Sequence, residues 1–147
     1  MQNRYLDYLR EEGYKEVSID ANGHISFKFG DCDYFAIIAE NDFPKHFFIF
    51  CGYRCEFASE EKKMQALQVA NCINTRDRIG KVVVDIDEEI VRMSAGIFFL
   101  KPEDFKLFLR QCLSLIKDLM FDFKTGIEKE SYKEYKKIMT IKRRAGL

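Results

Sequence analysis

The sequence lacks an excess of charge of either sign, because its 24 Lys and Arg residues balance its 24 Asp and Glu residues. With an isoelectric point near 6.7, the chain offers no general attraction to nucleic acid or to anionic lipid. It lacks a hydrophobic run of membrane-spanning length, and residues 1–10 lack the apolar centre of a signal peptide. These absences predict a soluble, cytoplasmic protein with no membrane partner, and they disfavour nucleic acid as a partner.

The sequence lacks the motifs that commonly carry catalysis or bind metals. The two histidines, His24 and His46, fall in separate predicted strands without a cysteine or carboxylate at metal-ligand spacing. The acidic run 85–89 lacks the glycine and the regular oxygen spacing of a calcium loop, which favours a solvated turn. The sequence also has no glycine-rich phosphate loop and no nucleophile-elbow serine. We therefore predict no enzyme activity, no metal and no cofactor.

The cysteines do not form a disulfide framework. They are odd in number and scattered through apolar segments, which suits a reducing compartment. Cys51 and Cys55 fall in or beside a predicted strand, whereas a reactive thiol is typically found at the start of a helix. We expect most of the five cysteines to be small core residues: Cys32, Cys51, Cys55, Cys72 and Cys112.

What the sequence does contain is ample apolar material for a core. Hydrophobic residues make up 47% of the chain and include fourteen phenylalanines, which excludes a disordered protein. Because 147 residues divided between two cores would leave each of them marginal, we expect one domain over residues 1–147. A basic C-terminal tail begins at about residue 128.

Periodicity, caps and turn residues predict the element order α, four β, α, two β, α, α. Helical spacing is found over 3–12, over 59–76 behind the N-cap Ser59, from Pro102 to 123, and again after Glu128. Asn22-Gly23 and Gly30-Asp31 are typical two-residue hairpin turns. The predicted strands are 16–19, 25–29, 32–40, 46–54, 81–87 and 90–100. This order indicates an α+β fold in which helices cover one face of an antiparallel sheet of about six strands.

The turn at Gly30-Asp31 decides which residues share a face of the sheet. In a two-residue hairpin the flanking residues point to the same side, so Phe29 and Cys32 lie together. The alternation of side chains then places Phe35 and Ile37 on the face opposite the predicted core.

The strand 46–54 is apolar on both sides. A five-residue loop over 41–45 places Phe47, Ile49 and Tyr53 on the same face as Phe35 and Ile37, whereas a four-residue loop reverses the assignment. With the five-residue loop, these five residues are the candidate protein interface. Because apolar residues on both faces of a sheet imply a cover, the outer face should lie under a terminal helix, another subunit or a protein ligand.

The tail is the most basic part of the chain. Between Lys133 and Arg144 there is a single acidic residue, Glu134. Lys142, Arg143 and Arg144 are the candidate basic contact, either with phosphate or with an acidic protein, although a solvated helix end is the simpler interpretation.

The chain resembles the YbjN-like family in three features. These are the element order, the segment 70–74 (Ala-Asn-Cys-Ile-Asn) at a helix end, and the following strand 80–85 (Gly-Lys-Val-Val-Val-Asp). Members of this family are described as bacterial sensory transduction regulators, and their fold is similar to that of type III secretion chaperones. The resemblance spans roughly residues 6–123. It implies a noncatalytic α+β protein that binds other proteins, often as a homodimer. Asn71 and Asn74 themselves are explained as helix-end residues that cap carbonyl groups or tolerate left-handed backbone.

The leading hypothesis is therefore a protein-binding or chaperone-like regulatory module of unknown partner that acts through an apolar surface. The alternative is a small-molecule sensor, or an enzyme, with a pocket between the sheet and the helices. In that case Cys51, Cys55 or His46 should lie at the edge of the pocket.

Overall fold

The fold is taken from a computed structural model that describes residues 3–146. The elements along the chain are α1 (Arg4–Glu11), β1 (Lys15–Ile19), β2 (Ile25–Phe29), β3 (Cys32–Ala39), β4 (Lys45–Arg54), α2 (Glu60–Arg76), β5 (Gly80–Asp85), β6 (Ile90–Phe99), α3 (Asp104–Glu128) and α4 (Tyr132–Arg144). The predicted α+β class and element order are confirmed.

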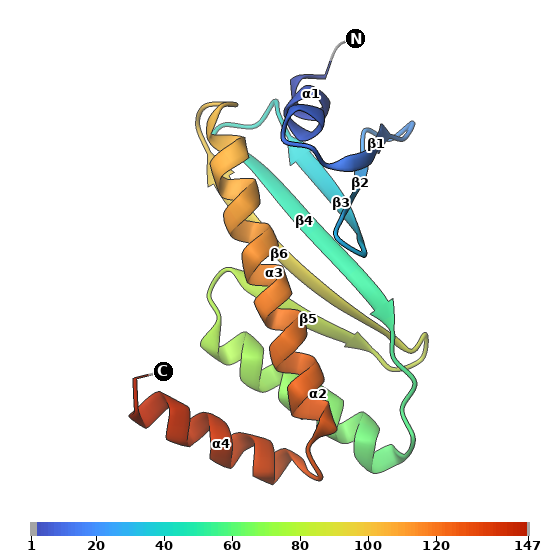
Figure 1. Cartoon of the computed structure of the whole chain (residues 1–147), viewed down its shortest axis with the longest axis vertical. Helices are drawn as coiled ribbons and strands as arrows, with labels where there is room; N and C mark the ends of the chain where they lie inside the picture. The colour runs from blue at the N-terminus through green and yellow to red at the C-terminus, as the bar shows by residue number, and fades with distance from the viewer. Residues whose placement is uncertain (1–2, 147) are drawn as a thin grey trace.

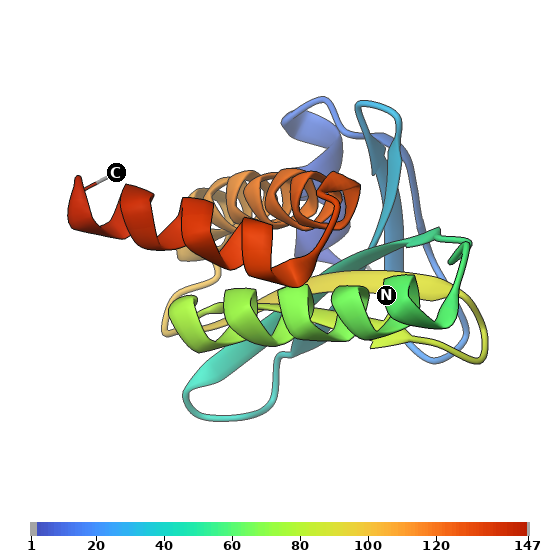
Figure 2. The same ribbon diagram turned by 90° about the horizontal axis from the view of Figure 1, so that it is seen from below.

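The strands form one antiparallel sheet in the order β1-β2-β3-β4-β6-β5. The helices lie on one side of this sheet, and α3 crosses it diagonally (Figures 1 and 2). The helices pack on the sheet through contacts of α3 with β4, β5 and β6, of α2 with β5, and of α1 with β1. The opposite side of the sheet carries no helix among the described residues, and we call it the open face.

The core fills the space between the sheet and the helices. Its inward strand residues include Phe27, Ile49 and Met93, all at most 2% exposed. The predicted stripe along α3 is buried against them, so that helix contributes Phe105, Leu109, Cys112, Leu113, Ile116, Leu119 and Phe123. Burial of this apolar stripe is the main source of the stability of α3.

The two hairpin predictions have different outcomes. Phe29 pairs with Cys32 across Gly30-Asp31, as predicted. The two-residue turn at Asn22-Gly23 is wrong, because Ile19 pairs with Ile25 and the Asp20 N–H donates to the His24 carbonyl oxygen. The loop between Asp20 and His24 therefore holds three residues. The Asp20 carboxylate accepts from the N–H groups of residues 22 and 24, and residue 23, at φ +84°, closes the turn.

The register between β3 and β4 decides which side of β4 faces the helices. Ala39 pairs with His46, whereas a five-residue loop would pair Glu40 with His46. A shift of one residue turns every side chain of β4 to the other face. The alternative four-residue loop is therefore the correct one.

The correction concerns Phe47, Ile49 and Tyr53, which the five-residue loop placed opposite the core. Phe47 and Ile49 are 1% and 0% exposed, and the Phe47 ring lies 5.0 Å from that of Phe105 on α3. Tyr53 is half-buried on the same side, with the Lys124 ammonium 4.7 Å from its ring centre. The physical reason is that both sides of β4 are apolar, so the hydrophobic pattern did not specify the register.

The C-terminal helix α4 does not cover the open face. Ser131 caps it by accepting from the Glu134 N–H, and Tyr135 is buried where α4 contacts α2 and α3. Gly126 of α3 permits this approach, because a Cβ there would lie 2.6 Å from Val69 Cγ1 and 3.1 Å from the Tyr135 ring. The terminal-helix cover is thus excluded for the described chain.

The described helices include none that is long and apolar enough to cross a membrane.

Candidate functional site

The open face carries a stripe of exposed aromatic and aliphatic side chains at the centre of the sheet. Phe35, Ile37 and Phe48 are 42%, 39% and 39% exposed, and Phe98 is 67% exposed. Phe50, between them, is half-buried by its neighbours. We call the set Phe35, Ile37, Phe48, Phe50 and Phe98 the aromatic stripe.

Strand register brings these residues together. Phe35 lies opposite Phe50 and Ile37 lies opposite Phe48, so β3 and β4 supply neighbouring pairs. The rings of Phe35 and Phe50 stack with centroids 5.4 Å apart at 23°, and those of Phe48 and Phe50 are 5.6 Å apart. Phe98 on β6 extends the stripe beside His46, at 5.5 Å. Such contacts hold the rings in a continuous surface without removing them from water.

Two glycines shape this surface. Gly96 on β6 lies opposite Phe48, and a Cβ there would lie 3.3 Å from the Phe47 carbonyl oxygen and in ordinary contact, at 3.5 Å, with Phe48 Cδ2. Gly52 on β4 lies opposite Arg92 and leaves a hollow of about 280 Å³. This Gly52 hollow is lined by Phe35, Phe50, Gly52, Tyr53, Arg54, Ile90 and Arg92.

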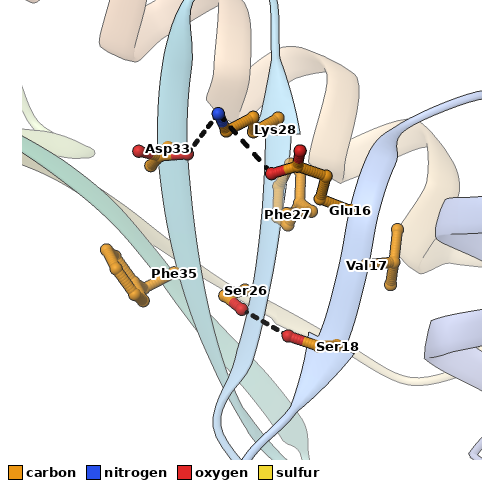
Figure 3. A pocket seen from close by; sticks show the side chains of 8 residues that line it. All are labelled: Glu16, Val17, Ser18, Ser26, Phe27, Lys28, Asp33 and Phe35. Atoms are coloured by element: carbon orange, nitrogen blue, oxygen red, sulfur yellow. Dashed lines mark hydrogen bonds and ion pairs between the residues drawn. The ribbon is translucent and has the colours of Figure 1, made fainter.

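A polar margin borders the stripe on the side of β1 and β2 (Figure 3). Lys28 lies 3.5 Å from the Glu16 carboxylate and 3.9 Å from that of Asp33, and the hydroxyls of Ser18 and Ser26 are 2.8 Å apart. A bulge between residues 15 and 18, with Glu16 at φ +51°, separates the strands and opens a hollow of about 560 Å³. An apolar centre with a polar margin is the usual anatomy of a protein interface.

The structure retains only part of the candidate interface. Phe35 and Ile37 lie on the open face, whereas Phe47, Ile49 and Tyr53 point towards the helices. Sequence reasoning missed Phe48 and Phe50 as outward residues. The sequence signal that identifies them is the four-residue alternative for the loop before β4, because that loop places both residues on the same face as Phe35.

The residues of the alternative pocket hypothesis do not come together. Cys51 and Cys55 are buried in the core, whereas His46 lies on the open face, 3.7 Å from the Asp42 carboxylate. Burial raises the pKa of the Cys51 thiol to about 12, and burial likewise raises the pKa of Cys55. Both thiols therefore remain protonated at neutral pH, the unreactive form.

The basic residues of the tail line a separate groove on the helical side. Lys142 and Arg143 of α4 face Arg76 of α2 across a hollow of about 350 Å³, which is also lined by Cys72 and Met139. The Arg76 guanidinium lies 2.7 Å from the Asp122 carboxylate and is thereby partly neutralised. Arg144 is exposed and is not among the residues that line this groove.

Fold and surface together define a class: an α+β protein whose helices cover one side of an antiparallel sheet and leave an aromatic stripe on the other. Residues 6–124 match the model of the YbjN family, whose description is "Putative bacterial sensory transduction regulator". Because the match covers most of the chain, the protein belongs to the YbjN family. Neither the search of curated proteins nor that of solved structures found a match.

Proposed function

We propose that this chain is a noncatalytic regulatory module of the bacterial cytoplasm that binds a protein partner through its open face. The observation that carries the proposal is the aromatic stripe, which none of the described helices covers. Contiguous apolar surface of this kind, rimmed by polar residues, is typical of protein interaction sites.

Two further observations support the proposal. The family description as a sensory transduction regulator fits a protein that acts by binding. The five cysteines are all free thiols, which suits a reducing compartment such as the cytoplasm, and the most deeply buried of them are unsuited to nucleophilic chemistry.

The test compares two double variants of the full chain. Phe35→Lys/Phe48→Lys places two charges in the stripe, and the matched control Leu107→Lys/Phe121→Lys changes two exposed apolar residues of α3. Because all four side chains are exposed, we expect unfolding free energies within about 1–2 kcal/mol of wild type, measured by urea titration.

Affinity capture with quantitative mass spectrometry, from the cells that produce the protein, provides the functional measurement. We expect the wild type and the α3 control to retain the same partner and the stripe variant to lose it. Equal partner recovery by the stripe variant and the control would contradict the proposal.

A further inference from the structure

We infer that the partner segment bound by the open face carries an apolar side chain next to a carboxylate, and that it docks at the Gly52 hollow. The inference rests on the proposed function and names the chemistry of the partner. It combines the shape of the hollow with the charges around it.

The hollow has an apolar interior that the chain itself leaves empty. Gly52, Phe50 and Ile90 are among the residues that line it. The backbone of Gly52 has no positive φ, so the turn geometry that often requires glycine does not apply here. Glycine within a strand often marks a bulge, a bend, or a close approach by a ligand or by another backbone segment. A Cβ at Gly52 would lie 3.3 Å from the Val91 carbonyl oxygen and 3.6 Å from Ile90 Cγ2, so the glycine lets the neighbouring strand approach closely.

Two guanidinium groups flank this apolar interior. Arg92 lies over the Phe50 ring at 5.9 Å, and Arg54 lies on the other side of Gly52 along β4. In the part of the chain that the structure describes, neither arginine forms an ion pair. Two unpaired guanidiniums beside an apolar hollow are complementary to a carboxylate next to an apolar side chain.

Some of the other charges of the open face are already engaged. Lys28 is shared between Glu16 and Asp33, and the Asp85 carboxylate accepts from the Glu88 N–H. A second copy of the chain is an alternative occupant of this face, which sedimentation distinguishes. Single-stranded nucleic acid can stack on aromatic rings, but it is bound by a cationic track along its phosphates, and the two guanidiniums at the hollow do not form such a track.

The experiment selects ligands without assuming their sequence. A random library of peptides about 12 residues long, displayed on phage, is panned on the immobilised full-length protein, and selected peptides are synthesised with a fluorescent label. Their affinity is measured by anisotropy for the wild type, Arg54→Glu/Arg92→Glu, Phe48→Lys and Gly52→Leu, the last of which fills the hollow and should weaken binding. The control Lys133→Glu/Lys137→Glu reverses two exposed charges on α4.

We expect the selected peptides to be enriched in Asp or Glu within two residues of Leu, Ile, Met or Phe. Their affinity should fall at least about thirtyfold in Arg54→Glu/Arg92→Glu, because a close charge pair is lost and a repulsion replaces it. The α4 control should bind as the wild type does. Replacing the peptide carboxylate by Lys should restore binding to the charge-reversed protein.

Four outcomes would overturn the inference. Some peptides could depend on Phe48 for binding yet bind the wild type and Arg54→Glu/Arg92→Glu equally well. This result would support the proposed function but reject an acidic partner. Selection of no peptide that depends on Phe48 would count against the proposed function as well. Sedimentation showing a dimer that Phe48→Lys dissociates would assign the face to a second copy. Binding of a labelled oligouridylate of about 12 nucleotides, abolished by Phe48→Ala, would assign it to nucleic acid.

Discussion

At the scale of single residues, burial determines the chemistry of the cysteines. Cys51 and Cys112 are buried among apolar side chains, and burial raises their thiol pKa values to about 12 and about 11. Cys32 and Cys72 are only partly buried. The most deeply buried thiols thus behave as small hydrophobic side chains.

We predict that iodoacetamide at pH 8 modifies Cys32 and Cys72 of the folded protein well before Cys51, Cys55 and Cys112. The thiolate is the reactive form, and the raised pKa of Cys51 keeps its thiolate fraction small below pH 9. Peptide mass spectrometry over time measures the order, and a sample unfolded in urea, where all five should react, provides the control.

The same pKa shift has a consequence for stability. Because the pKa of Cys51 is raised on folding from its ordinary value of 9.0, its contribution to stability is complete below about pH 9. That contribution is lost as the pH rises towards 12, the folded-state value.

For the iodoacetamide experiment, fast modification of Cys51 or Cys55 in the folded protein at pH 8 would favour a reactive site instead.

At the scale of the elements, the end of α2 holds the edge strand β5. The side-chain amide of Asn74 donates to the Val82 carbonyl oxygen at 2.8 Å, and its oxygen accepts from the Val82 N–H at 2.7 Å. One side chain thus occupies the backbone groups that a neighbouring strand would use. This protects the outer edge of the sheet from pairing with another chain.

We predict that Asn74→Leu lowers the free energy of unfolding by about 2–4 kcal/mol, because two backbone groups lose their partner in a partly buried position. The matched control is Asn71→Leu, one turn earlier and exposed, which should change stability by less than about 0.5 kcal/mol. Urea titration monitored by circular dichroism measures both. Equal effects of the two substitutions would contradict the role assigned to Asn74.

The elements themselves were largely predictable from the sequence. Ser59 caps α2 as expected, and the apolar stripe of α3 is buried along its length. Local signals of this kind suffice for helices and for the Gly30-Asp31 turn. They failed at Asn22-Gly23, where the Asp20 side chain adds contacts that select a longer loop.

At the scale of the whole molecule, the face predicted to need a cover exists, but three of the five residues assigned to it lie on the other side. Phe35 and Ile37 were correctly placed because a two-residue turn fixes their parity. Phe47 and Ile49 were exchanged with Phe48 and Phe50 because β4 is apolar on both sides. That ambiguity is itself informative, since a strand needs two apolar sides only when both of them are covered.

The position of α4 leaves the aromatic stripe without a cover from the described chain. Its contacts with α2 and α3 keep it on the helical side of the sheet, where Tyr135 is buried (Figure 2). The helix also lies outside the segment that matches the family model. The aromatic stripe is therefore available for another molecule in the described structure.

The most direct test of this account is site-specific photo-crosslinking in the cells that produce the protein. p-Benzoylphenylalanine replaces Phe48 in the stripe or, as the control, Phe121 on the exposed side of α3. The account predicts a defined protein adduct from position 48 on irradiation and no corresponding adduct from position 121. The absence of any protein adduct from position 48, or the same adduct from both positions, would contradict it.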